Sequence, residues 1–92
     1  MTIVTLRYWA AAKEAAGIAE ETIDAATLAE ALAAARGQAG PGGPGEQDER
    51  LRSVLARSSF LINGEPVGSR ARDSVVLEDA AVIEVLPPFA GG

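Results

Sequence analysis

Apolar and polar residues alternate in two short segments, one near each end of the chain, and this pattern constrains the fold most. Residues 3–9 read IVTLRYW, and residues 81–86 read AVIEVL. A period of two is typical of a β-strand that buries one face and exposes the other. The residues expected on the buried faces are Val4, Leu6, Tyr8, Ile83 and Val85. The residues expected on the opposite faces are Ile3, Thr5, Arg7, Trp9, Val82, Glu84 and Leu86.

The first half of the chain also contains the signals of two helices and a second strand. The elements predicted there are a helix at 10–16 ended by Gly17, a strand at 18–24, and a helix at 27–36 that stops at Gly37. Thr27 and Glu30 match a capping box, in which each side chain satisfies an open backbone amide of the first turn. The apolar stripe of this helix consists of Leu28, Ala31, Leu32 and Ala35.

The second half begins with a segment rich in glycine and proline. The elements predicted there are a flexible loop at 37–45, a helix at 48–57 and a hairpin at 60–67. Leu51, Val54 and Leu55 are spaced to face the core. Asn63-Gly64 suits a type I′ turn, because both central residues of that turn need a positive φ. Pro66 cannot donate a backbone hydrogen bond, so the second arm of the hairpin is expected at a sheet edge.

Together these elements predict an α+β domain, with helices packed on one face of a mixed sheet. The 92 residues are enough for a single domain. We expect the domain to span 1–86 and a flexible tail to span 87–92. No apolar run approaches the roughly 20 residues that cross a bilayer, and the N-terminus does not resemble a signal peptide. The expected location is therefore the cytoplasm.

The composition excludes several kinds of chemistry. The chain has no histidine and no cysteine, which excludes disulfides, thiolate or imidazole catalysis, and zinc sites built on these residues. We therefore expect no metal. The net charge is −5 and no stretch is rich in lysine or arginine, so nucleic acid and anionic membranes are poor partners. The acidity fits either solubility alone or attraction to a basic protein partner.

The last residues, LPPFAGG, are unlike the end of an ordinary strand. Pro87-Pro88 favours an extended conformation with little entropy to lose, which would project residues 89–92 away from the sheet. Glycine has no Cβ, so Gly91 and Gly92 could enter a narrow channel and present a carboxylate to an enzyme. A carboxylate is unreactive until it is activated, and adenylation by ATP would activate it.

With these residues in view, the chain resembles the small subunits of molybdopterin synthase, which are ubiquitin-like sulfur carriers of the β-grasp fold. The resemblance covers nearly the whole chain. It rests on the opening strand that runs into YWAAAKEAAG, the capped helix at 27–36, the INGEPV hairpin and, above all, the closing IEVLPPFAGG.

This resemblance implies parallel, central first and last strands. It also implies that an E1-like enzyme uses ATP to adenylate Gly92, which then becomes a thiocarboxylate. The tail would enter the large synthase subunit and deliver sulfur to cyclic pyranopterin monophosphate during molybdenum cofactor biosynthesis. The chain would hold no permanent cofactor, would not catalyse a reaction alone, and would act in a hetero-oligomer. The residues assigned to this chemistry are Gly91 and Gly92.

An apolar patch is expected beside the exit of the tail. If the first and last strands are neighbours, Trp9 and Leu86 share the face opposite the core. An exposed aromatic next to a leucine is typical of a protein–protein docking surface. The alternative is that both side chains pack beneath a helix or a loop. The residues predicted to bind the partner are Trp9, Leu86, Pro87, Pro88, Phe89 and Ala90. Arg7 and Lys13 are candidates for contact with the E1-like enzyme, although solvated surface is the simpler interpretation.

Other functions fit the same tail. The chain could carry sulfur for thiazole or cysteine biosynthesis, although thiazole carriers usually lack a helix like 48–57. It could be a modifier that is joined through Gly92 to lysines of other proteins, or a plain β-grasp interaction module.

One turn departs from the family pattern. The family often has Asp-Gly-Asp before the last strand, and this chain has Asp79-Ala80-Ala81. Because alanine is strained at positive φ, we expect this turn to adopt another form.

Overall fold

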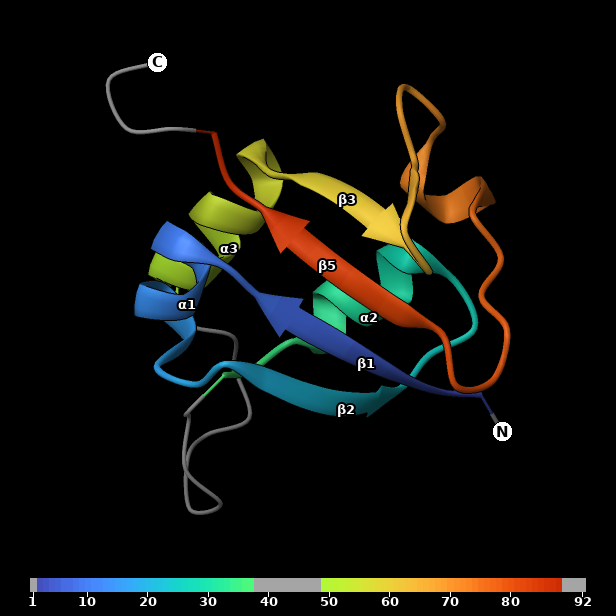
Figure 1. Ribbon diagram of the computed structural model, residues 1–92, viewed down its shortest axis with the longest axis horizontal. Helices are drawn as coiled ribbons and strands as arrows, with labels where there is room; N and C mark the ends of the chain where they lie inside the picture. The colour runs from blue at the N-terminus through green and yellow to red at the C-terminus, as the bar shows by residue number, and fades with distance from the viewer. Residues whose placement is uncertain (1, 38–48, 89–92) are drawn as a thin grey trace.

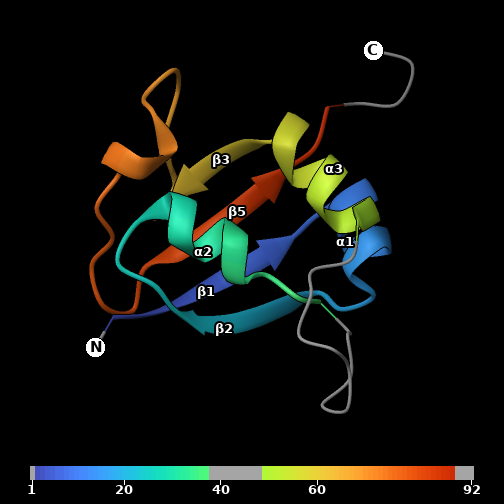
Figure 2. The same cartoon turned by 180° about the vertical axis from the view of Figure 1, so that it is seen from behind.

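The computed structural model describes residues 2–37 and 49–88, which form a five-stranded sheet with helices on one face (Figures 1 and 2). The elements are β1 (Ile3–Tyr8), α1 (Ala10–Ala16), β2 (Glu20–Asp24), α2 (Leu28–Ala34), α3 (Glu49–Arg57), β3 (Ser59–Ile62), β4 (Glu65–Pro66), the 3₁₀ helix η1 (Arg72–Ser74) and β5 (Val82–Leu86). This is the α+β, β-grasp arrangement that the sequence predicted. The glycine- and proline-rich loop after Gly37 lies outside the described residues.

The strands are ordered β2-β1-β5-β3-β4, so the last strand lies at the centre of the sheet. β5 pairs in parallel with β1, and all other neighbouring strands are antiparallel. In the parallel pair, Leu6 lies opposite Ile83 and Tyr8 lies opposite Val85. The expectation that the first and last strands are parallel neighbours is therefore confirmed.

The core lies between the sheet and the helices and follows the predicted alternation. All five strand residues expected on the buried faces are buried. The helices cover them with Leu28, Leu32, Leu51 and Leu55, which are also buried, while Val54 is only partly buried against the core. β1 ends at Tyr8, one residue earlier than predicted, because Trp9 is the residue that precedes α1.

The second helix begins as predicted and ends early. Thr27 Oγ1 accepts a hydrogen bond from Glu30 N at 3.2 Å, which is one half of the capping box. The Glu30 carboxylate accepts from Ala26 N at 3.1 Å, one residue before the expected partner. α2 ends at Ala34, because Ala35 has extended backbone angles (φ −61°, ψ 125°). The predicted strand at 18–24 is likewise shorter and begins at Glu20.

The hairpin between β3 and β4 has the predicted turn. Asn63 and Gly64 have φ values of 51° and 84°, as a type I′ turn requires. The Asn63 side chain also accepts a hydrogen bond from Val82 N at 3.0 Å, which joins the turn to the start of β5. Pro66 lies in β4 at the edge of the sheet, as expected.

Adjacent carboxylates such as Glu20 and Glu21 are usually solvated, and the sequence predicts this for both, but Glu21 is half-buried. Its register opposite Leu6 places it on the helix-covered side of the sheet. Its carboxylate accepts hydrogen bonds from Tyr8 Oη at 2.9 Å, from Arg36 N at 3.1 Å and from Gly37 N. Burial raises the pKa of Tyr8, and the adjacent Glu21 carboxylate raises it further through its charge and through the hydrogen bond. Tyr8 therefore remains a donor, and this contact ties β1, β2 and the end of α2 together.

Gly37 has no room for a side chain. Its φ is +61°, and a Cβ added there would lie 2.4 Å from the backbone oxygen of Ala16. Gly64 has an equally left-handed backbone (φ +84°), but nothing lies within 4 Å of the corresponding position. The two glycines therefore separate the effect of backbone strain from that of a steric clash.

We expect Gly64→Ala to lower the free energy of unfolding by about 1 kcal/mol, from backbone strain alone. Gly37→Ala should lower it by at least about 2 kcal/mol, because strain and overpacking add. Urea denaturation of the two variants tests this. Equal losses would show that Ala16 moves away without penalty.

The turn before β5 contains a left-handed alanine, and here the sequence-based prediction fails. Ala80 has a φ of +71°. Its N–H donates to Ile3 O at 2.7 Å, and Asp79 Oδ1 accepts from Ile3 N at 2.9 Å. These two hydrogen bonds to β1 hold the turn in a left-handed form that favours glycine, so the alanine is strained.

Ala80→Gly should therefore raise the free energy of unfolding by about 0.5–1 kcal/mol, because glycine relieves strain that exceeds its entropic disadvantage. The matched control is Ala33→Gly, at an exposed position of α2, which should lower stability by about 1 kcal/mol. Thermal denaturation measures both. A loss for Ala80→Gly comparable to that of the control would contradict the assignment of strain.

Candidate functional site

The tail leaves the domain from the central strand of the sheet. The last residues of β5 pair with β1 on one side and with β3 on the other, where Leu86 lies opposite Ser59. Leu86 and Pro87 are half-buried and Pro88 is exposed. The start of the tail thus has a fixed position at one end of the sheet (Figure 1). Phe89, Ala90, Gly91 and Gly92 lie outside the described residues.

The face of the sheet opposite the helices carries a row of side chains across all five strands. The register aligns Glu20, Arg7, Glu84, Leu61 and Pro66 in this order. Arg7 Nε lies 3.4 Å from Glu20 Oε2, and the two side chains are 48% and 55% exposed. An ion pair this exposed adds little to stability. It joins Arg7 to Glu20 on a surface that none of the described helices covers.

Trp9 lies on the corner between this open face and α1. Its side chain is 46% exposed. It lines a shallow hollow of about 270 Å³ that also involves Arg7, Lys13 and Glu20. Trp9 and Lys13 are four residues apart at the start of α1, a spacing that brings side chains together on a helix. This spacing can be read from the sequence and indicates that the Lys13 side chain lies near that of Trp9. The sequence-based prediction nevertheless treated the two residues separately.

The structure supports only part of the predicted docking patch. Trp9 is extended (φ −119°, ψ 151°) and directly follows Tyr8, the partner of Val85, so Trp9 and Leu86 continue neighbouring strands. Trp9 is not packed beneath a helix or loop. Leu86, however, does not line the hollow that Trp9 lines. A single patch formed by both residues remains a prediction.

The described residues show no sign of a metal centre or a membrane span. Within 2–37 and 49–88, no group of three or more aspartates or glutamates is placed to hold a metal ion. None of the helices in these ranges is long and apolar enough to cross a bilayer.

Comparison with known proteins places these features in a family. The sequence model of the ThiS family matches residues 6–92. No curated protein matches the chain.

Several solved structures share the fold. Small archaeal modifier protein 1 from Methanosarcina acetivorans is 24% identical, with 100% of this chain and 98% of that chain covered and a TM-score of 0.70. A putative molybdopterin converting factor subunit 1 from Pyrococcus furiosus is 17% identical, with 97% and 100% covered and a TM-score of 0.66. A chain in the complex of subunits 1 and 2 of molybdopterin-converting factor from Helicobacter pylori is 24% identical, with 99% and 100% covered and a TM-score of 0.62. At these identities the likeness establishes the β-grasp fold.

The exposure of Trp9 leads to a stability prediction. Trp9→Ala should change the free energy of unfolding by no more than about 1 kcal/mol, because the side chain is exposed. Tyr8→Ala, at the adjacent buried position, should lower it by at least about 3 kcal/mol. Guanidinium denaturation of the two variants provides the comparison. Similar losses would make Trp9 a core residue and remove it from the candidate docking surface.

Proposed function

This chain belongs to the ThiS family and is a sulfur carrier or ubiquitin-like modifier, and we propose that it is the sulfur-carrying subunit of a molybdopterin synthase. The observation that carries the proposal is the family match, which extends through the closing Gly91-Gly92. The fold supports it, because the tail follows directly from the central strand of the sheet.

The chemistry of the proposal takes place on the carboxylate of Gly92. A carboxylate oxygen attacks the α-phosphorus of ATP on an E1-like enzyme, and pyrophosphate leaves. Hydrosulfide (HS⁻) then attacks the carbonyl carbon of the adenylate, AMP leaves, and loss of a proton gives the thiocarboxylate. On the large subunit, the thiocarboxylate sulfur displaces an oxygen substituent at a carbon of cyclic pyranopterin monophosphate, and water then hydrolyses the thioester to Gly92, which leaves the sulfur on the pterin and restores the carboxylate. ATP is used by the activating enzyme, and the carrier itself holds no permanent cofactor.

The remaining described residues have supporting roles in this proposal. The structure from Helicobacter pylori contains subunits 1 and 2 of a molybdopterin-converting factor, which supports a large-subunit partner and a hetero-oligomer. Trp9, Leu86, Pro87 and Pro88 would contact that partner beside the start of the tail, with Phe89 and Ala90 following them into it. On this proposal the carrier works in the cytoplasm and catalyses nothing alone.

A second candidate is a protein modifier, which the likeness to small archaeal modifier protein 1 favours. In that case the same adenylate would be attacked by a lysine amine, and an isopeptide bond would replace the thiocarboxylate. Sulfur transfer to a thiazole or cysteine pathway would use the thiocarboxylate with a different acceptor.

Mass spectrometry of the intact chain distinguishes these outcomes. We expect the chain ending at Gly92, isolated from cells of its source, to include a species in which one oxygen is replaced by sulfur. A chain lacking Gly91-Gly92 should show no such species and should not capture the adenylating enzyme. Capture of a molybdopterin synthase large subunit by the full chain, weakened at least tenfold by Trp9→Ala, would support the specific pathway.

Three results would favour a function other than the proposed one. Isopeptide adducts on the lysines of other proteins would favour the modifier. A thiazole or cysteine synthase in place of the large subunit would change the pathway but keep the sulfur chemistry. Partners that bind equally well without Gly91-Gly92 would identify a plain interaction module.

A further inference from the structure

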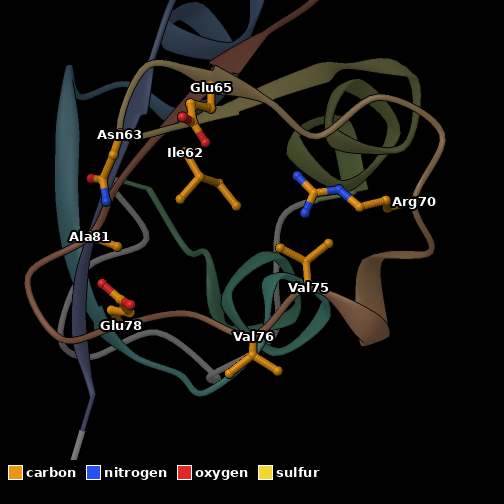
Figure 3. A pocket seen from close by; sticks show the side chains of 8 residues that line it. All are labelled: Ile62, Asn63, Glu65, Arg70, Val75, Val76, Glu78 and Ala81. Carbon is orange, nitrogen blue, oxygen red and sulfur yellow. The ribbon is translucent and has the colours of Figure 1, made fainter.

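A hollow of about 370 Å³ opens beside the β3–β4 hairpin, at the start of β5 (Figure 3). Its lining residues are Ile62, Asn63, Glu65, Arg70, Val75, Val76, Glu78 and Ala81. Val75 and Ala81 are buried and Ile62 is half-buried, so the floor is an apolar edge of the core. This volume lies near the lower end of the range for ligand sites and is enough for one long side chain and its neighbours.

Val76 stands on the rim of this hollow with its side chain 77% exposed. Its backbone is well fixed, because it forms a β-bridge with Thr27. The residues on either side are also held, since Val75 O accepts from Leu28 N at 3.0 Å and Leu77 N donates to Ala26 O at 2.8 Å. Val76 is thus an apolar side chain presented to solvent by a rigid segment, as at a contact surface.

The charged groups of the rim are arranged on opposite sides. Arg70 extends its guanidinium toward the hollow from one side, and the carboxylates of Glu65 and Glu78 lie across from it (Figure 3). Arg70 donates to Val67 O at 3.0 Å and to Pro66 O at 3.4 Å. Among the described residues, neither carboxylate has a hydrogen-bond or ion-pair partner. The rim therefore has an excess of negative charge next to an apolar floor.

We propose that this hollow receives an arginine or lysine side chain from an apolar segment of a partner protein. Such a side chain combines an aliphatic stem with a charged end. The stem would lie on Val75 and Val76, and the charged end would meet the two carboxylates. Nucleic acid and anionic membranes are disfavoured, because both would meet these carboxylates and a chain of net charge −5.

The position of the hollow allows it to act together with the tail. Ala81 directly precedes β5, and the tail follows Leu86 at the other end of that strand. Five residues of β-strand span roughly 17 Å. A side chain seated in the hollow therefore does not occupy the exit of the tail, and this inference holds whichever chemistry the tail performs.

Titration of the isotope-labelled chain with matched dipeptides tests the proposal by NMR. The probes are N-acetyl-leucyl-arginine amide and N-acetyl-leucyl-citrulline amide, which differ in charge and hardly in shape. We expect saturable shifts of the Asn63, Val75 and Val76 amides in the millimolar range. The arginine probe should bind at least threefold more tightly.

Variants of the chain show which side chains bind the two probes. Glu65→Gln and Glu78→Gln should each weaken binding of the arginine probe by about threefold, as expected for exposed charge pairs. Neither should change binding of the citrulline probe. Val76→Thr, which keeps the shape of the side chain, should weaken both probes. Glu14→Gln, an exposed carboxylate on α1, removes the same charge elsewhere and should change nothing.

The proposal fails if the two probes bind equally, if neither gives saturable shifts, or if the shifts map to the open face of the sheet. It also fails if Glu14→Gln weakens binding as much as Glu78→Gln does. Preferential binding of a short DNA or of anionic lipid vesicles at the same amides would assign the hollow to another class of partner and overturn the proposal.

Discussion

The parallel pairing of β1 with β5 is the interaction on which the rest of the structure depends. It joins segments near the two ends of the sequence and makes the last strand the central one. Because β1 and β5 supply most of the buried strand residues, the helices have a surface to cover only once this pair has formed. Contacts between such distant segments involve a large loss of chain entropy. The sheet and the helical layer therefore depend on the same long-range pairing.

Two kinds of polar contact adapt this framework to its particular sequence. The Glu21 carboxylate accepts hydrogen bonds from one phenol and two backbone amides where β1, β2 and the end of α2 meet. Near the opposite end, Asn63 and Asp79 each accept a hydrogen bond from one backbone amide, that of Val82 and that of Ile3, and so hold two turns close to the start of β5. These contacts lie at the ends of strands, where backbone N–H groups no longer have a partner on the neighbouring strand. They fix the geometry at the ends of the strands and leave the outer face of the sheet free.

Local patterns in the sequence predicted the parts of the fold that depend on local chemistry. Alternation identified the buried faces of β1 and β5, and Asn63-Gly64 identified the hairpin, because burial and turn type follow from neighbouring residues. Ala80 was misjudged, since two hydrogen bonds to Ile3 override its own conformational preference. Glu21 and the hollow beside Val76 could not be predicted, because each brings together residues that are distant along the chain. At the candidate site, the sequence identified Trp9 as exposed, but its neighbour Glu20 lies on another strand and became clear only in three dimensions.

The central position of β5 also determines how the domain responds to force. Strands on both sides hold β5 along its length, with hydrogen bonds that run across the strand direction. A pull applied to the tail along the axis of β5 loads all of these hydrogen bonds at once, in shear. It does not break them one after another. An edge strand pulled at right angles to its axis would unzip under a smaller load. The domain therefore resists unfolding when it is pulled by its C-terminal end along the strand.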